Sequence, residues 1–243
     1  MKEIDWSELG KSFQDKSAEE ILEYSFSELS AHGEVLFLTA FGPEGCVILK
    51  MIYDLASQQK IKKEKIIIAN LDTGYQFKET LELKDTLEKT YQLKIEMIQP
   101  SLSIDQQNQK YGKDLFKSDP DQCCYLRKLV PLNNLLTGKL AWITSIRKEQ
   151  SEHRAMAKAF EYDKKFKLGK INPLLNWTKS DIWKYIHEHK SPYNSLLDKG
   201  YDSIGCEPCT SPGEDRKGRW AGKDKIECGL HIQDSELEGE FII

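Results

Sequence analysis

Hydrophobic and polar positions follow a helical period near the N-terminus of the chain. Ser17 and Glu20 have the spacing of a capping box, and apolar residues follow at helical spacing from Ile21 to Leu29. The pattern stops at Gly33, a residue type that commonly follows a helix end. We therefore expect an amphipathic helix that buries one face and ends near Gly33.

Short apolar runs and helical patterns then alternate along the chain. Residues 34–39 form a continuous apolar run that predicts a buried strand, and residues 40–45 form a loop rich in Gly and Pro. Residues 47–57 return to helical spacing, which completes a unit of strand, loop and helix. The further predicted elements are strands at 65–70, 94–98 and 140–145, a charged helix that ends near residue 90, and a helix at 178–189.

This alternation predicts an α/β fold with a Rossmann-like, mostly parallel sheet flanked by helices. In such sheets, ligands bind beyond the carboxyl ends of the strands. The loops at residues 40–45, 71–74 and 146–151 each follow a predicted strand. We expect these three loops to meet at one crevice.

The periodic pattern ends near residue 200. Residues 200–229 are dominated by Gly, Pro and charged side chains, which are typical of irregular backbone. We expect a nucleotide-binding α/β domain over residues 1–199, including the N-terminal helix. An extended C-terminal segment over residues 200–243 would belong to the same structural unit.

Composition narrows the range of partners. The 243 residues are 39% hydrophobic and 30% charged, as in ordinary soluble proteins, and 35 Lys and Arg face 39 Asp and Glu. The net charge of −4 predicts no general attraction to nucleic acid or to an anionic membrane, so an anion site must be a local cluster. Because no stretch approaches the roughly 20 apolar residues of a spanning helix, and free cysteines favour a reducing compartment, we expect a cytoplasmic protein.

Four of the six cysteines have the spacing of metal ligands. Cys123 and Cys124 are adjacent, and Cys206 and Cys209 form a C-x-x-C pair far downstream. Zinc and an iron–sulfur cluster are both open, but adjacent cysteines converge poorly on one small ion, whereas a cubane offers each thiolate its own iron. The residues therefore favour a cluster. A redox-active C-x-x-C pair normally lies at the start of a helix, and residues 210–213 do not have a helical pattern. The residues therefore disfavour a redox role for this pair.

The other two cysteines lie in different surroundings. Cys228, near the end of the chain, is a candidate nucleophile, although the neighbouring Glu227 disfavours a thiolate. Cys46 lies among apolar residues, and we expect it to be a small buried side chain. Activation of Cys228 requires cations that fold against it, and the candidates are Lys225, Arg216, Arg219 and Lys128.

Several basic residues lie beside these motifs. Lys128 follows the second adjacent cysteine by four residues and shares a helix face with it, whereas Arg127, on another face, is expected at the surface. Arg147 and Arg154 flank a loop that follows a predicted strand, where side chains can reach a bound nucleotide. A position on an exposed helix explains Arg154 equally well, so we favour only Arg147 as a nucleotide contact. His231 lies three residues after Cys228 and either contacts the thiol or is exposed, and exposure is the commoner outcome for such a histidine.

Taken together and in this order, these motifs resemble the assimilatory sulfonucleotide reductases. The resemblance runs from about Val35 to His231 and rests on the four paired cysteines, the loop at residues 145–151 and the ending at residues 227–231. Among these reductases, the chain is most similar to the adenylyl-sulfate reductases that carry an iron–sulfur cluster. The resemblance implies the adenine nucleotide alpha hydrolase-like version of the Rossmann-like fold.

The resemblance also implies a reaction in sulfate assimilation and cysteine biosynthesis. In this family, a cysteine near the C-terminus attacks the sulfur of adenylyl sulfate, AMP leaves, and a thiosulfonate stays on the protein until thioredoxin or glutaredoxin releases sulfite. Cys228 matches that nucleophile, and Arg147 matches an arginine that faces the nucleotide. Lys128, Arg216 and Arg219 would face the sulfate and phosphate. A 4Fe-4S cluster would be held by Cys123, Cys124, Cys206 and Cys209.

The first two loops carry further candidates for substrate contacts. The family usually has a serine and an acidic pair in the first loop, whereas Ala40 and Gly45 supply neither. Backbone amides at the helix start, next to Gly42, can still bind an anion. In the second loop, Asp72 and Thr73 either contact the ribose or purine or cap the next helix.

Three alternative functions stay open at this point. A 3′-phosphoadenylyl-sulfate reductase, or an enzyme for both substrates, would use the same chemistry but needs additional cations for the extra phosphate. An ATP-using, adenylyl-transferring relative would carry a serine-rich loop and no thiol nucleophile. A zinc-stapled nucleotide-binding module would catalyse nothing. The sequence does not decide whether the protein forms homo-oligomers.

Overall fold

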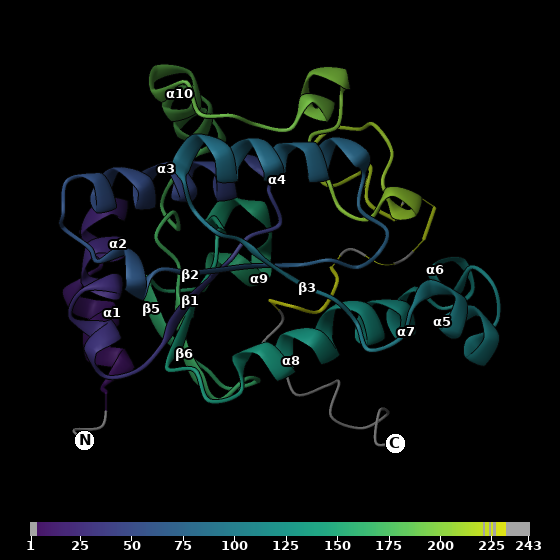
Figure 1. Ribbon diagram of the computed structural model, residues 1–243, viewed down its shortest axis with the longest axis horizontal. Coiled ribbons are helices and arrows are strands. Elements are labelled where there is room, and N and C mark those ends of the chain that lie inside the picture. Colours follow the sequence, from purple (N-terminus) through teal and green to yellow (C-terminus); the bar gives the residue numbers. More distant parts are fainter. Residues whose placement is uncertain (1–3, 221, 224, 226, 232–243) are drawn as a thin grey trace.

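The centre of the computed structural model is a six-stranded sheet with helices on both faces (Figure 1). The structure describes residues 4–220, 222, 223, 225 and 227–231. The strand order is β3-β2-β1-β4-β6-β5, and neighbouring strands are parallel except for β5 and β6. The expected α/β fold is confirmed. The strands are β1 (Val35–Leu38), β2 (Ile67–Leu71), β3 (Glu96–Ile98), β4 (Ala141–Ile143), β5 (Phe160–Asp163) and β6 (Leu168–Ile171).

Helices connect and cover these strands. The α-helices are α1 (Trp6–Ser12), α2 (Ala18–Phe26), α3 (Pro43–Ser57), α4 (Lys78–Tyr91), α5 (Ile104–Tyr111), α6 (Leu115–Ser118), α7 (Pro120–Cys124), α8 (Val130–Leu136), α9 (Glu152–Ala155) and α10 (Lys179–His189). Short 3₁₀ turns lie at Leu29–Ala31, Lys63–Lys65, Lys148–Gln150, Ser195–Lys199 and Glu207–Cys209. The predicted capping box of α2 is present, because the Ser17 and Glu20 side chains each accept from the other's backbone N–H. None of the described helices is long and apolar enough to cross a membrane.

The strands send alternate side chains into two apolar layers. In β1, Val35 and Phe37 belong to the layer shared with α2, α3, α4 and α10, whereas Leu36 belongs to the layer shared with Leu132 and Leu136 of α8. All five side chains are buried. A parallel strand that is covered on both faces needs apolar residues at consecutive positions, which explains the continuous run at residues 34–39.

Helix α3 starts four residues earlier than the sequence predicted. Pro43 occupies its first turn, where a missing N–H costs nothing, and Gly42 is the extended N-cap residue. Residues 43–45, which we expected in a loop, therefore belong to the helix. As a result, the N-terminus of α3 lies directly after the carboxyl end of β1.

The hairpin of β5 and β6 was not predicted from the sequence. Its strands contain the charged residues Glu161 and Lys170, which interrupt the alternation of apolar and polar residues that predicts a strand. Lys170 is nevertheless only 2% exposed. The two charges form an ion pair with an Nζ–Oε1 distance of 3.3 Å. Gly169 is required here because the Trp6 ring of α1 lies where a Cβ would project. The hairpin adds β6 next to β4 and leaves β5 as an antiparallel edge strand.

Residues 120–136 form a helical path with a wide turn at its middle. Helix α7 continues into a π-helical turn at Tyr125–Leu129, which continues into α8. The prediction of a helix through both adjacent cysteines and Lys128 is therefore confirmed, with a wider turn than expected. π-Turns insert one extra residue into a helix and are frequent at functional sites.

The C-terminal segment lies along the carboxyl ends of the strands as irregular backbone, as predicted. Isolated β-bridges join Gln76 to Cys206, Tyr201 to Gly213, and Thr210 to Arg219. The first bridge ties the segment to the loop after β2. Residues 232–243 of the expected segment lie outside the described residues.

Candidate active site

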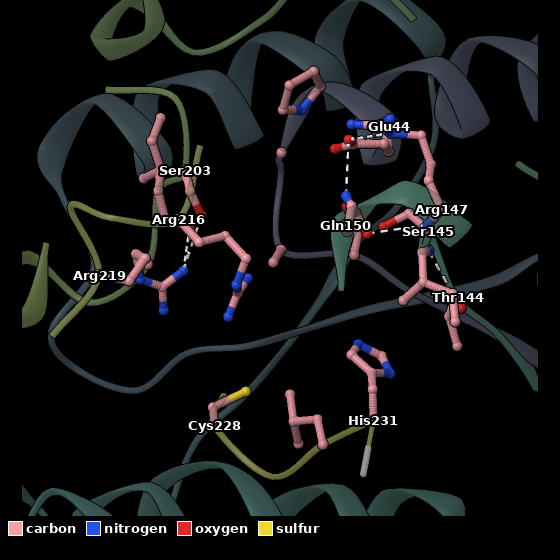
Figure 2. A pocket seen from close by; sticks show the side chains of 18 of the residues that line it. Glu44, Thr144, Ser145, Arg147, Gln150, Ser203, Arg216, Arg219, Cys228 and His231 are labelled. Atoms are coloured by element: carbon pink, nitrogen blue, oxygen red, sulfur yellow. Dashed lines mark hydrogen bonds and ion pairs between the residues drawn. The ribbon is translucent and has the colours of Figure 1, made fainter. Parts of the chain in front are cut away.

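The loops after β1, β2 and β4 meet at one cavity of about 600 Å³ at the carboxyl edge of the sheet. Figure 2 shows lining residues that follow β1 and β4 and lining residues of the C-terminal segment. The predicted convergence of the three loops is therefore confirmed. Of the sequence-predicted site residues, the cavity lining includes Gly42, Thr73, Lys128, Arg147, Cys206, Arg216, Arg219 and Cys228.

The first loop brings the N-terminus of α3 to the cavity. The Thr39 hydroxyl accepts a hydrogen bond from the Phe41 N–H at 3.0 Å, which shapes the turn before Gly42. A Cβ on Gly45 would lie 2.5 Å from the Thr39 Oγ1, so close packing explains why Gly45 carries no side chain. The start of a long helix with free N–H groups at a cavity favours anionic ligands there.

The Arg147 side chain is buried in the cavity wall and holds two carboxylates. Its Nε donates to the Glu44 Oε1 at 2.8 Å, and its guanidinium also contacts Glu149. The Gln150 amide donates to the same Glu44 oxygen at 3.0 Å. The positive charge of Arg147 is therefore compensated locally, and the arginine loop is fixed onto α3.

Asp72 and Thr73, in the loop after β2, have different roles in the structure. The Thr73 Oγ1 lies 3.3 Å from the Cys206 Sγ and faces the cavity. Asp72 lies outside the cavity lining, and its carboxylate accepts from the Gly74 N–H at 3.0 Å and from the Gln99 amide at 3.2 Å. Asp72 therefore stabilises the turn that presents Thr73.

The Cys228 thiol lies in the cavity with three of the four cations predicted to activate it, Lys128, Arg216 and Arg219, and Figure 2 shows the two arginines. The fourth candidate, Lys225, is not part of the cavity lining and instead pairs with the Asp121 carboxylate. Burial alone would raise the pKa of the Cys228 thiol. The Lys128 ammonium, a hydrogen bond from the Leu230 N–H and the Arg219 guanidinium outweigh burial, so the pKa lies below its ordinary value even with Glu227 opposing. The site therefore favours the thiolate, which is the nucleophilic form of cysteine.

Lys128 and Cys228 affect each other's pKa in opposite directions. Burial opposes a charge on its ammonium, but the negative charge that the nearby cysteines Cys206, Cys228 and Cys124 can carry raises the pKa of Lys128. Its Nζ also lies 6.0 Å from the centre of the Trp220 ring. This lysine links the paired cysteines to the cavity that holds Cys228.

Arg219 is packed tightly against the backbone of the segment. A Cβ on Gly205 would lie 2.2 Å from an Arg219 guanidinium nitrogen, so this glycine makes room for the side chain. Arg219 stacks on Trp220 at 4.6 Å and donates to the Ile204 carbonyl at 3.4 Å. Its buried Nε has no hydrogen-bond partner among the described residues, as is also true of the Arg154 Nε. Unpaired buried donors at a cavity are expected where a ligand completes the site.

Glu227 joins two arginines next to the candidate nucleophile. The Arg154 Nη2 lies 3.1 and 3.3 Å from the two Glu227 carboxylate oxygens, and the Arg216 Nη2 lies 3.1 Å from Oε2. Arg154 and Glu227 are each only 8% exposed. The sequence is compatible with both a surface role and a loop role for Arg154, and the structure places this arginine in the cavity wall.

The four predicted ligand cysteines line one small pocket behind this cavity, of about 20 Å³. Burial and the neighbouring thiolates raise the pKa of Cys123 to about 12, and mainly burial raises that of Cys124 to about 11. No three Cys, His, Asp or Glu side chains of the described residues are placed to hold a single metal ion. The four thiols therefore border one common pocket behind the cavity.

Two residues differ from the sequence expectation. Arg127, expected at the surface, is 4% exposed, donates to the Gln107 side chain at 3.0 Å and contacts the Thr73 carbonyl. His231, expected to be exposed, stacks on Trp142 at 5.6 Å, and burial with nearby Arg154 lowers its pKa well below the ordinary value. Both expectations were wrong because the partners are distant in sequence.

Comparison with known proteins identifies the family. The family described as "Phosphoadenosine phosphosulfate reductase domain" matches residues 34–212. The chain belongs to the phosphoadenosine phosphosulfate reductase family. The adenosine 5′-phosphosulfate reductase of Geobacillus sp. (strain WCH70) is 44% identical over 224 residues, which cover 90% of this chain and 92% of that protein.

Solved structures agree with this phosphoadenosine phosphosulfate reductase assignment. Phosphoadenylyl-sulfate (PAPS) reductase from Candida auris, in a phosphate complex, superposes with a TM-score of 0.72 at 30% identity and covers 85% of this chain and 96% of that chain. Candida glabrata FMN adenylyltransferase, in complex with FMN and an ATP analog, superposes with a TM-score of 0.58 at 15% identity. The match covers 86% of this chain and 72% of that chain. The second similarity concerns the fold alone.

Proposed function

We propose that this protein reduces adenylyl sulfate to sulfite and AMP, with Cys228 as the nucleophile. The observation that carries the proposal is the position of Cys228 in a cavity at the carboxyl ends of the strands, together with Lys128, Arg216 and Arg219. A thiolate and an anionic nucleotide repel each other unless cations lie between them. Three cations in one cavity lower that barrier and stabilise the charge that develops on the leaving phosphate.

The covalent step is a transfer of the sulfonate group. The Cys228 thiolate attacks the sulfur of adenylyl sulfate, a sulfur–sulfur bond forms, and the bond between that sulfur and the bridging oxygen breaks. AMP leaves with the electron pair of the broken bond, and Cys228 carries a thiosulfonate. The lowered pKa of Cys228 supports this step because the attacking group must be deprotonated.

A second thiol must complete the reaction. A thiolate of thioredoxin, or of glutaredoxin, attacks the Cys228 sulfur and expels sulfite with the electron pair of the sulfur–sulfur bond. The second thiol of that reductant then attacks the mixed disulfide and restores the Cys228 thiolate. The reductant supplies two electrons and leaves as a disulfide.

We propose that Cys123, Cys124, Cys206 and Cys209 hold a 4Fe-4S cluster. When bound, the cluster would provide a fixed charged group behind the cavity, next to Lys128. Lys128 would hold its ammonium between this group and the substrate. An anaerobic preparation that is brown and contains iron and labile sulfide supports this assignment, whereas a colourless protein with stoichiometric zinc contradicts it.

The charge pattern of the cavity favours adenylyl sulfate over the 3′-phosphorylated nucleotide. Lys179 lies 2.7 Å from an Asp202 oxygen and 3.6 Å from an Asp215 oxygen, and Arg147 also contacts two carboxylates. A 3′-phosphate would have to compete with these carboxylates for the cations. We expect a higher kcat/KM for adenylyl sulfate, and equal values for both nucleotides would contradict this preference.

The decisive experiment is mass spectrometry of the enzyme mixed with adenylyl sulfate in the absence of thioredoxin. A sulfonate adduct on the peptide that contains Cys228 is expected. Cys228→Ser should lose the adduct and reduce sulfite formation by more than about a thousandfold, since the nucleophile is gone. Release of AMP by Cys228→Ser at the wild-type rate would contradict the proposal.

A further inference from the structure

Side chains from distant parts of the chain hold the residues on either side of Cys228. Before it, the Glu227 carboxylate is bound by Arg154 at 3.1 and 3.3 Å, and the cavity residue Arg216 also contacts it at 3.1 Å. After it, the Gly229 carbonyl accepts a hydrogen bond from the Lys165 Nζ at 2.7 Å. The nucleophile therefore lies between two anchored neighbours, and each anchor comes from a distant part of the chain.

The two anchors come from different parts of the fold. Arg154 lies in α9, which follows the loop after β4, and Lys165 lies in the turn between β5 and β6. The Asp163 carboxylate fixes that turn, because it accepts from the Lys165 N–H at 3.1 Å and from the Phe166 N–H at 3.2 Å. Asp163 is buried, so the Lys165 side chain starts from a rigid backbone.

The segment needs such anchors because its own backbone restrains it weakly. Residues 227–231 form neither helix nor strand, and Gly229 has a positive φ of 86°. Glycine lacks a Cβ and can adopt many backbone conformations, so this residue restrains the segment little. Covalent attack requires the thiol to lie within about 3–3.5 Å of the sulfur and in line with the leaving group. Contacts on both neighbours of Cys228 restrict its side chain to one region of the cavity.

We propose that Arg154 and Lys165 are positioning residues that clamp Glu227 and Gly229, and so hold the Cys228 thiol where it meets the sulfate end of the nucleotide. This inference rests on the proposed function of Cys228. Lys165 acts through the backbone of Gly229, and Arg154 acts through Glu227. Neither residue is assigned a contact with the reacting atoms.

The main test compares Lys165→Met with the matched control Lys164→Met, in which the neighbouring, exposed lysine is changed. The rate of adduct formation on Cys228 is measured at saturating adenylyl sulfate without thioredoxin, and the dissociation constant of AMP is measured separately. We expect Lys165→Met to slow adduct formation by about 10- to 100-fold, because a displacement near 1 Å has that effect. AMP affinity should change less than about twofold, and Lys164→Met should behave like the wild type.

Two further variants separate positioning from general damage. Lys165→Arg retains a donor for the Gly229 carbonyl and should recover adduct formation to within about fivefold of the wild type. Arg154→Gln should also slow adduct formation, and the double variant should lose less than the product of the two single losses, because either loss frees the thiol. A wild-type adduct rate in Lys165→Met, or an equal loss of AMP affinity, would overturn the clamp.

A second readout does not require turnover. Alkylation of Cys228 by iodoacetamide, located by peptide mapping, should be about five times faster in Lys165→Met than in the wild type and in Lys164→Met, because an unclamped thiol is more accessible. Removal of a nearby cation would by itself slow alkylation, so an increase reports release of the segment. Unchanged alkylation would overturn the clamp, whereas a wild-type enzyme without any adduct would instead overturn the proposed function.

Discussion

The central sheet and the C-terminal segment are held by different forces. In the sheet, Leu36, Phe37 and Ile143 are completely buried and pack against helices on both faces. The segment from residue 200 to residue 231 buries few large apolar side chains, and Trp220 is its most buried aromatic residue. Polar contacts hold the segment instead, such as the donation from the Lys223 Nζ to the carbonyls of Phe116 and Lys117 at 2.9 and 2.7 Å.

Because of this difference, the global free energy of unfolding and the free energy of opening the active-site segment depend on different residues. Apolar burial contributes about 25 cal/mol per Å², and a core residue adds to the global free energy of unfolding. Exposed ion pairs contribute only about 0–1 kcal/mol each. We therefore expect the segment that carries Cys228 to open at a lower free energy than the sheet unfolds, as substrate entry and product release require.

The largest expected effect comes from a cavity in the sheet. Phe37→Ala should lower the free energy of unfolding by about 3–5 kcal/mol, because a completely buried ring is removed from a packed layer. Lys223→Met, in the segment, should lower it by less than about 1 kcal/mol. Urea titration followed by circular dichroism measures both changes. Equal losses would mean that segment and sheet unfold as one unit, which contradicts the comparison.

A smaller effect concerns the charge that Lys128 provides. Burial raises the pKa of Cys228 and Lys128 lowers it, so Lys128→Met should move the pH dependence of Cys228 alkylation to higher pH. At pH 7 the thiolate fraction and the alkylation rate should fall, and the two enzymes should converge at high pH, where both thiols are deprotonated.

The control for this experiment is Lys117→Met, an exposed lysine that is 68% accessible. Iron and sulfide content should be measured for each preparation, so that loss of the proposed cluster is not mistaken for loss of the charge. An unchanged pH profile in Lys128→Met, with iron content preserved, would show that this ammonium does not activate the thiol.

The smallest expected effect is the displacement of one guanidinium. Gly205→Ala places a Cβ about where the Arg219 guanidinium lies, and the flexible arginine can move aside at little cost in stability. The KM for adenylyl sulfate should rise about 3- to 10-fold with the urea midpoint unchanged, because one charge-assisted hydrogen bond to an anion is weakened. A matching loss of stability would instead indicate that the backbone of the segment had shifted.

The parts that were predicted from the sequence depend on local patterns. Apolar runs revealed the parallel strands, and the spacing of Cys206 and Cys209 revealed one ligand pair. The hairpin of β5 and β6 was missed because Glu161 and Lys170 neutralise each other only once the strands pair. The charged residues of this hairpin therefore prevented its recognition from the sequence, although the strand β6 is buried.

The missed site residues share another cause. Arg154 meets Glu227 across 73 positions, and Lys165 meets Gly229 across 64 positions. Nothing near Lys165 in the sequence distinguishes it from a surface residue, and a helical surface run explained Arg154 as well as a role at the predicted loop did. By contrast, the candidate role of Lys128 was visible because its cysteine neighbour lies four residues away.

Cys46 gives the protein a built-in reference for thiol counting. Its side chain is fully buried in α3, and burial raises its pKa to about 12, so a chromogenic thiol reagent cannot titrate it while the sheet is intact. Cys228, in contrast, becomes titratable as soon as its segment opens. Any thiol count that includes Cys46 therefore requires that the core has unfolded, whereas the reaction of Cys228 requires only that its segment opens.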